Sequence, residues 1–420
     1  MKFALISNVL PPSESAHAMI IHRLLRDLDP GCYCLLSSRN YNTGDQPNYS
    51  GRLAGRYYYL PPALEVTRGN SLLLQAAGEA ITLGLRVVLR GRAIARILRR
   101  EKCAAVVVCT GGNEILDFPA GYLASRLVGA RFYAYLLDQY SHMVSYVLGK
   151  SFLRLFEPLV MNGAAGVIAP NEFLRDELRR RYQLEAVVIH NACDLSVYEK
   201  SRADGGGGAD RADDEIRIVY TGGVGPLHYD AFRNLVAALN LLASGDVKFG
   251  GKSARLHLYT AQIQAECEGE GIHGPVVYHE HEPGSAMPAI QRQADVLFLP
   301  LAFDSPYDEI VGTAAPGKMG EFLAARRPIL VHAPSDSFIA WYFRHHECGL
   351  VVDQNDPALL GEALELLLTD VSLSERLSAR AWERAQADFS LAKAQAQFAE
   401  VIGLNVLCGT NEGTPPLGAK

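Results

Sequence analysis

Residues 294–331, ADVLFLPLAFDSPYDEIVGTAAPGKMGEFLAARRPILV, contain the pattern from which the whole chain is built. The apolar run DVLFLPL predicts a buried strand, and RPILVHA at 327–333 predicts the next one. Between them lie a loop with Pro and Gly and the short amphipathic segment KMGEFLAAR. Because continuous apolar strands joined by helices form parallel sheets covered on both faces, this stretch predicts one unit of a doubly wound α/β domain.

The same alternation continues on both sides of this unit and divides the chain into two halves. Residues 201–215, SRADGGGGADRADDE, include four consecutive glycines and predict a linker. We expect a Rossmann-like N-terminal domain over 1–200 and a second over 216–385, facing each other across a cleft. Residues 386–407 predict a helix able to cross back to the first domain, and 408–420 a disordered tail. The expected strands are 2–7, 32–38, 104–110, 131–138, 165–170, 216–223, 254–261, 275–282, 295–301, 327–333 and 348–354.

Composition and charge restrict the class of protein. A chain of 420 residues with 49% apolar and 20% charged residues is globular and long enough for two cores. Residues 1–200 carry a net charge of +6 and the remainder −12, which suggests that the first half meets an anion. The basic residues are not interleaved with aromatic ones, so nucleic acid is not the expected partner.

Targeting signals are also restricted by the sequence. The first apolar run is closed by two prolines, and no apolar run is long enough to span a bilayer. The eight cysteines are scattered, without the spacing of a zinc or redox motif. We expect a cytoplasmic protein with reduced thiols.

The loop before KMGEFLAAR is the first candidate site. A loop with Gly312 and Gly317 at the start of a helix is expected to leave backbone N–H groups free for an anion. Lys318 adds a positive charge, and Glu321 follows one turn later, where its carboxylate can accept hydrogen bonds from a ribose diol. These groups match the polar end of a nucleoside diphosphate. A solvated helix face is the alternative that the spacing leaves open.

Several motifs resemble family 4 of the retaining glycosyltransferases, which have the GT-B fold. In the second half the resemblance is carried by ADVLFLPL (294–301), PGKMGEFLAARRPILV (316–331) and CGLVVDQNDPALLGEALELLLTD (348–370). In the first half it is carried by AAGVIAPNEFLRDELRRRYQLEAVVIHNACDLSVY (164–198) and LISNVLPPSESAHAMIIHRLLRDL (5–28). The motifs follow the family's order and span nearly the whole chain.

The resemblance implies roles for individual residues. Lys318 would bind the diphosphate and Glu321 the ribose, while residues 279–287 would form the loop near the base. Asp138, at the end of a strand, would orient the acceptor, although capping the following helix is an equal alternative; His142 is expected at the surface. The remaining expected donor contacts are backbone groups or close approaches at Gly222, Gly223, Thr313, Ala314, Ala315 and Gly317.

The implied reaction moves a sugar from a nucleoside diphosphate donor, UDP-sugar favoured, to an acceptor hydroxyl with retention and without metal or cofactor. Its product would be a polysaccharide, a glycolipid or a glycosylated metabolite. The familiar second glutamate is Thr313 here, and only His228 follows the Gly-Gly turn where a basic residue is usual. SESAH (13–17) replaces the family's N-terminal Gly-Gly pair. A GT-B sugar-nucleotide epimerase and a non-catalytic subunit that binds a nucleotide or a partner therefore stay open. No GxGxxG follows either opening strand, which disfavours NAD.

A second candidate surface is the basic segment LRVVLRGRAIARILRREK, residues 85–102. Helical spacing groups its arginines at 86, 90, 96 and 100 on one flank, apart from the apolar positions 87, 94 and 98. Such a helix suits an anionic membrane, which would place the protein on the inner face of the cell membrane with a lipid-linked acceptor. An arginine-rich helix packed on the sheet is the alternative.

Overall fold

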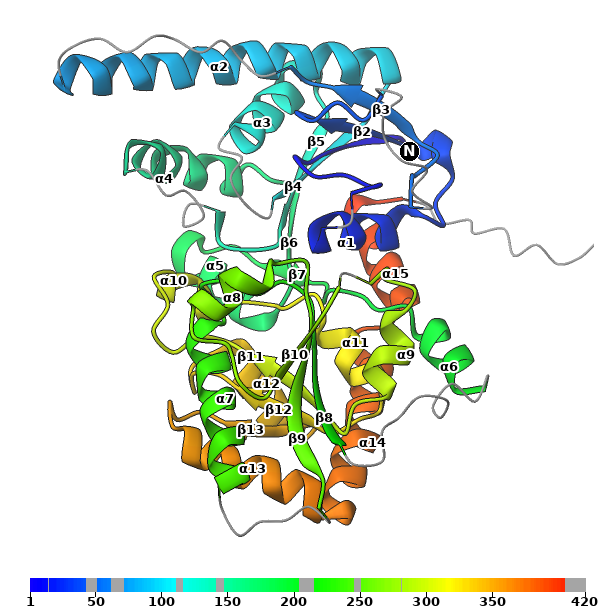
Figure 1. Ribbon diagram of the computed structural model, residues 1–420. Helices are drawn as coiled ribbons and strands as arrows, with labels where there is room; N and C mark the ends of the chain where they lie inside the picture. The colour runs from blue at the N-terminus through cyan, green and yellow to red at the C-terminus, as the bar shows by residue number, and fades with distance from the viewer. Residues whose placement is uncertain are drawn as a thin grey trace, which may run out of the picture.

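The computed structural model describes residues 1–13, 15–42, 51–61, 72–110, 116–140, 147–203, 215–244, 251–280 and 282–404. These residues form two α/β domains stacked along the long axis of the molecule, each built on one parallel sheet (Figure 1). The architecture confirms the expected pair of doubly wound domains.

The N-terminal sheet has seven strands in the order β3-β2-β1-β4-β5-β6-β7, all parallel. The strand order reverses between β1 and β4, because β2 and β3 lie on one side of β1 and β4 to β7 on the other. In open α/β sheets, ligands bind at such a topological switch point. The strands are β1 (Phe3–Ile6), β2 (Tyr33–Ser37), β3 (Arg56–Tyr59), β4 (Ala105–Thr110), β5 (Arg131–Leu136), β6 (Gly166–Ala169) and β7 (Ala186–Val188).

Side chains that alternate along these strands pack into two separate hydrophobic cores, one on each face of the N-terminal sheet. Ala4 and Ile6 face the core that α2, α3, α4 and α5 cover, whereas Phe3 and Leu5 face α1 and α15. Ser15 accepts a hydrogen bond from the backbone N–H of Ala18 and is the N-cap of α1. The helices are α1 (Ala16–Leu25), α2 (Leu72–Glu101), α3 (Asp117–Val128), α4 (Val147–Asn162), α5 (Glu172–Tyr182) and α15 (Leu391–Ile402), with a 3₁₀ turn η1 (Pro30–Cys32) before β2.

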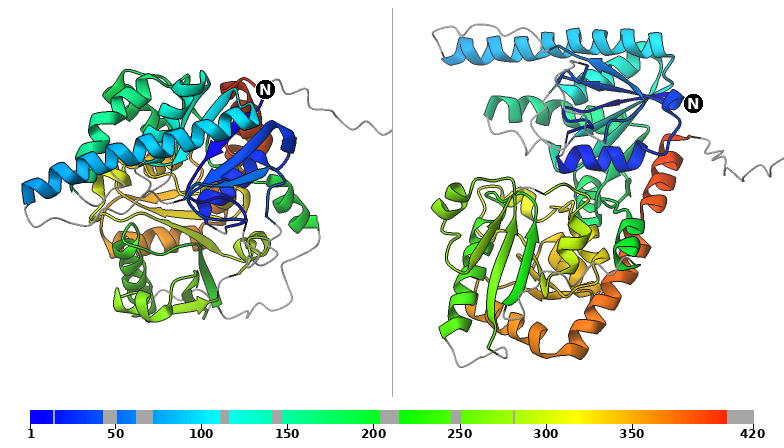
Figure 2. Two further views of the ribbon diagram at one scale, coloured as in Figure 1. Left: turned by 90° about the horizontal axis from the view of Figure 1, so that it is seen from above. Right: turned by 45° about the vertical axis from the view of Figure 1, so that its right-hand side comes forward.

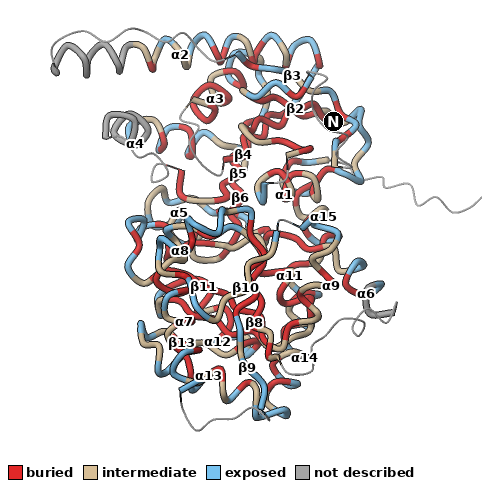
Figure 3. The backbone as a smooth tube through the Cα atoms, viewed as in Figure 1, coloured by how far each residue is buried: buried red, intermediate tan, exposed pale blue. Residues whose placement is uncertain are grey.

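The C-terminal sheet has six parallel strands in the order β10-β9-β8-β11-β12-β13. Its strands are β8 (Glu215–Thr221), β9 (Ser253–Tyr259), β10 (Val276–His279), β11 (Val296–Pro300), β12 (Ile329–His332) and β13 (Leu350–Val352). On one face pack α7 (Tyr229–Ser244) and α13 (Pro357–Thr369), and on the other α11 (Met319–Ala324), α12 (Phe338–His345) and much of α14 (Val371–Asp388). The remaining helices are α6 (Leu195–Ala203), α8 (Gln264–Gly269), α9 (Met287–Arg292) and α10 (Asp308–Val311). Figure 3 shows the buried residues concentrated along both sheets.

The chain passes between the domains at two neighbouring places. The N–H of Cys193 donates to the carbonyl of Phe389 at 2.8 Å, so the outward and return segments lie side by side. After the return, α15 packs against α1, and its Phe398 is completely buried 6.0 Å from Phe3. Figure 2 shows α14 and α15 running along one side of the molecule from the lower domain to the upper one. The C-terminal helix is therefore part of the N-terminal core.

Some sequence expectations fall outside the described residues. Most of the expected linker 201–215 and the whole of the tail 408–420 are among them, as is His142. In the part of the chain that the structure describes, the seven cysteines are unpaired, and no helix has the length and apolarity to cross a membrane.

Candidate functional site

The loop from Thr313 to Lys318 lies where the two domains meet. It follows α10 and begins α11, and three amide side chains of the N-terminal domain hold it. Gln139 Nε2 donates to the hydroxyl of Thr313 at 3.1 Å. Asn171 Nδ2 donates to the Thr313 carbonyl at 2.8 Å, and Asn191 Nδ2 to the Ala315 carbonyl at 2.9 Å. These amides follow β5, β6 and β7, so the carboxyl edge of one sheet fixes the candidate donor loop of the other domain.

Lys318 extends from this loop toward the end of β8. Its ammonium donates to the hydroxyl of Tyr220 and lies 3.7 Å from the centroid of that ring. No described carboxylate forms an ion pair with Lys318. A phenol and a ring face compensate a buried cation only in part, because neither carries a full negative charge.

Gly222 provides the space for this lysine. Its φ is +129°, a conformation that favours glycine, and a Cβ there would lie 2.8 Å from Lys318 Nζ. Gly223 differs: a Cβ would meet only Gln262, at 3.8 Å, which is ordinary contact. The backbone conformation therefore favours glycine at 222, whereas the protein itself leaves room for a side chain at 223; the approach of both residues to a diphosphate stays a prediction.

Burial controls the charge of this group of side chains. Desolvation lowers the pKa of Lys318 to about 7, against the opposing effect of the Glu321 carboxylate. Burial, helped by the charge of Lys318, lowers the pKa of His228 to about 3, so this imidazole is neutral at physiological pH. His228 Nδ1 is buried without a partner in the described residues. An anion bound beside Lys318 would favour its charged form and raise this lowered pKa.

Glu321 points to the other domain. Its Oε1 accepts from Arg23 of α1 at 2.6 Å, and Arg23 also donates to the carbonyl of Ala192 at 2.9 Å. The two ionic side chains are 18% and 13% exposed, so solvent screens their interaction only in part. Among the described residues, no donor contacts Oε2 of Glu321. Arg23 therefore fixes the carboxylate and leaves one oxygen for another partner.

The backbone of the loop corrects part of the expected anion site. The N–H groups of Thr313 and Ala314 donate within turns to Ile310 and Val311, at 3.1 and 3.3 Å, so they are not free for a ligand. Ala315, Gly317 and Lys318 have N–H groups without a partner in the described residues. A Cβ on Gly317 would lie 3.6 Å from Ala16 at the start of α1, which keeps the two domains close here.

Asp138 follows β5 directly before Gln139 and is half-buried. Burial raises its pKa to about 7, so it can donate or accept a proton near neutrality. The structure describes α4 from Val147, and residues 141–146 lie outside the described residues, so the capping alternative for Asp138 also stays open. Whether Asp138 contacts an acceptor stays a prediction.

The loop expected near the base, residues 279–287, starts at the carboxyl edge of the C-terminal sheet, where β8 also ends. His279 ends β10, and its ring stacks on Tyr259 of β9 with centroids 4.0 Å apart. Tyr259 pairs with Thr221, immediately before Gly222. Residues 282–285 are exposed, and His281 lies outside the described residues. In the described chain, no group of three or more His, Cys, Asp or Glu residues could hold a metal.

Comparison with solved structures identifies the fold as GT-B. HepE from Anabaena, solved with UDP and glucose, is 13% identical with a TM-score of 0.63, over 96% of this chain and 100% of that one. Sucrose-phosphate synthase from Thermosynechococcus elongatus is 16% identical with a TM-score of 0.63, over 95% and 98%. A putative UDP-N-acetylglucosamine 2-epimerase from Listeria monocytogenes is 12% identical with a TM-score of 0.56, over 96% and 95%. No family model matches the sequence, and no curated protein matches it.

The sequence missed the side chains that hold the site together. Gln139, Asn171 and Asn191 each stand just after a strand, a position that could have marked them as residues of the cleft. Tyr220 lies within β8. The alternation of side chains along a strand predicts that Tyr220 is buried, but it does not predict its contact with Lys318. Arg23 lies far from Glu321 in the sequence, and no local pattern pairs them.

We predict that Gly222→Ala lowers the free energy of unfolding by about 1 to 3 kcal/mol, because alanine at a φ of +129° strains the backbone and its Cβ would also displace the Lys318 ammonium. Chemical denaturation followed by circular dichroism measures the change. Gly223→Ala is the matched control and should change the free energy of unfolding by less than about 1 kcal/mol, since a Cβ there makes only ordinary contacts with the protein. Equal losses of stability in both variants would contradict the assigned geometry.

Proposed function

We propose that the protein is a glycosyltransferase that moves a sugar from a nucleoside diphosphate donor, with UDP as the favoured nucleotide, to an acceptor hydroxyl. The observation that carries this proposal is the incompletely compensated ammonium of Lys318 beside Gly222, in a loop that both domains hold. The structures of HepE with UDP, with UDP-glucose, and with UDP and glucose support a uridine nucleotide in the donor. The acceptor, and a peripheral site of action on a membrane, are part of the proposal.

In this proposal the diphosphate lies between Lys318 and the free N–H groups of Ala315, Gly317 and Lys318. Negative charge grows on the diphosphate as the bond from the anomeric carbon to the phosphate oxygen breaks, and a fixed ammonium stabilises that charge. The free Oε2 of Glu321 would accept the ribose hydroxyls. The charge that a metal ion would otherwise supply comes from Lys318, so we propose that no metal or other cofactor is needed.

Retention of configuration is proposed from the resemblance to family 4. The acceptor oxygen would attack the anomeric carbon on the face that the diphosphate leaves, and its proton would pass to a phosphate oxygen of the leaving group. Asp138, at the carboxyl edge of the N-terminal sheet, would orient the acceptor hydroxyl. Its pKa near 7 suits a group that exchanges hydrogen bonds with a hydroxyl.

Epimerisation of a sugar nucleotide is the second candidate function. The putative epimerase among the structural neighbours and the near-neutral pKa of Asp138 favour it. Conversion of free UDP-N-acetylglucosamine without an acceptor would establish it, whereas UDP release that requires an acceptor supports transfer. Binding of UDP without turnover of any donor would favour the third alternative, a non-catalytic subunit.

We predict that Lys318→Ala lowers kcat/KM for sugar transfer at least tenfold, because a loss of about 1.4 kcal/mol in transition-state stabilisation corresponds to that factor. UDP release from a purified donor with an acceptor measures the change. Lys252→Ala is the control, since Lys252 is exposed beside the start of β9, at the opposite edge of the sheet. A fall smaller than tenfold would show that Lys318 does not stabilise the leaving diphosphate.

We predict that Arg23→Gln raises the donor KM about tenfold with a smaller change in kcat, because Glu321 would lose the partner that orients it. Donor saturation curves measure the two constants. Arg26→Gln is a matched control: Arg26 is the C-cap of the same helix and pairs with Asp194 at the same distance of 2.6 Å, away from the loop 313–318. If both variants raise KM equally, Arg23 acts only through stability.

A further inference from the structure

The outward face of α2 differs in chemistry from the rest of the N-terminal domain. This helix lies at the end of the molecule farthest from the C-terminal domain, and its first half projects beyond the body (Figures 1 and 2). Ile94, Ala95 and Leu98 face the core, and Arg90 pairs with Asp117 at 2.6 Å in the interior. Arg90 is therefore unavailable to a partner, which corrects the flank expected from the sequence.

The opposite face combines apolar and basic residues in two successive halves. Leu85, Val88 and Leu89 are 52%, 37% and 41% exposed. The exposed positions that follow on the same face are all basic: Arg92, Arg96, Arg99 and Arg100. From 85 to 100 this face contains no acidic residue. We call these seven residues the α2 outer face. It spans about 23 Å, at 1.5 Å per residue.

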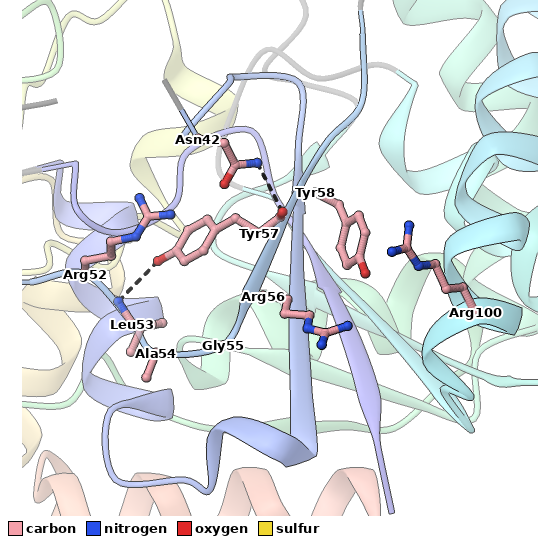
Figure 4. Close-up of a pocket in the computed structure, with 9 residues that line it drawn as sticks. All are labelled: Asn42, Arg52, Leu53, Ala54, Gly55, Arg56, Tyr57, Tyr58 and Arg100. Atoms are coloured by element: carbon pink, nitrogen blue, oxygen red, sulfur yellow. Dashed lines mark hydrogen bonds between the residues drawn. The ribbon is translucent and has the colours of Figure 1, made fainter. Parts of the chain in front are cut away.

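A hollow of about 700 Å³ continues the basic half beyond the end of the helix. Figure 4 shows Arg56 and Arg100 on either side of Tyr58, with Arg52 and Tyr57 across the edge strand β3. Arg52 lies 4.3 Å from the ring of Tyr57, and Arg100 6.0 Å from that of Tyr58. The neighbouring carboxylate of Glu101 is already bound by Lys2, Arg56 and Tyr58, so it leaves Arg52 and Arg100 without a described counter-ion.

We propose that the α2 outer face and the arginine hollow dock on an anionic lipid surface. The three apolar residues would enter the boundary between headgroups and acyl chains, and the arginines would bind lipid phosphates. Docking at this end keeps the C-terminal domain in water. If the proposed function holds, the acceptor is then membrane-borne.

Charge decides between a membrane and a second copy of the chain as the occupant. Two copies that met through the whole α2 outer face with two-fold symmetry would run antiparallel, so the arginines of each would face the leucines and valine of the other without a counter-ion, which is unfavourable. An anionic bilayer offers the opposite charge together with an apolar interior. The apolar residues would contribute nothing to a purely electrostatic partner such as nucleic acid, which binds through phosphate contacts.

The test is sedimentation of the full-length protein with phosphatidylcholine vesicles that contain or lack phosphatidylglycerol. We expect at least tenfold tighter binding to the anionic vesicles, weakened by salt. The double variants Arg92→Gln/Arg96→Gln and Leu85→Asn/Leu89→Asn should each reduce that binding about tenfold. Arg179→Gln/Arg180→Gln makes the same change in charge on exposed residues of α5 and should leave it unchanged.

Equal binding to neutral and anionic vesicles would overturn the proposal, as would an equal loss in the α5 control. A concentration-dependent dimer in light scattering that the α2 variants abolish would show that a second copy occupies this face instead. The thermal midpoint of each variant confirms that the surface substitutions leave the fold intact. Because vesicle binding needs no donor, this result is independent of whether the protein transfers a sugar.

Discussion

The ammonium of Lys318, half-buried against Tyr220 with no carboxylate of the described residues paired to it, is the interaction that organises this site. An incompletely compensated cation that is partly removed from water costs free energy, and here burial lowers its pKa to about 7. Gly222 is favoured by its φ of +129°, and a Cβ there would also lie 2.8 Å from this ammonium. The same charge disfavours protonation of His228, so the lysine is the cation of this group near neutral pH. A bound diphosphate would supply the missing negative charge.

The second constraint is that neither domain builds the site alone. The C-terminal domain supplies Lys318 and Glu321, and the N-terminal domain holds their loop through three amides and Arg23. The return of α15 to the N-terminal core ties the domains together by a second connection. Any movement of one domain relative to the other would change the position of Glu321 through Arg23. The geometry of the candidate site therefore depends on the arrangement of the two domains.

The fold could be predicted well because its signals are local. All six strands of the second domain and five of the seven in the first were expected, since each is a continuous apolar run. β3 was missed because Arg56–Tyr59 is a partly exposed edge strand, and β7 because it has only three residues. The positions of Lys318 and Gly222 followed from motifs beside strands. Arg23, Tyr220 and the three amides could not be assigned contacts, because their partners are distant in sequence and chosen by the packing of the domains. The exposed arginines of α2 were only partly identified, since helical spacing alone does not show which face meets α3.

The pKa of Lys318 can be measured by NMR on protein with ¹³C-labelled lysine, with Lys318→Met to assign its signal. We predict titration near pH 7 in the free protein and at clearly higher pH with UDP bound, because the diphosphate favours the charged form. Since the phosphate's second ionisation lies near 6, UDP binding at pH 8 should take up a proton, and affinity should fall as pH rises above 7. Titration near the ordinary value of 10.5, unchanged by UDP, would contradict the role assigned to Lys318.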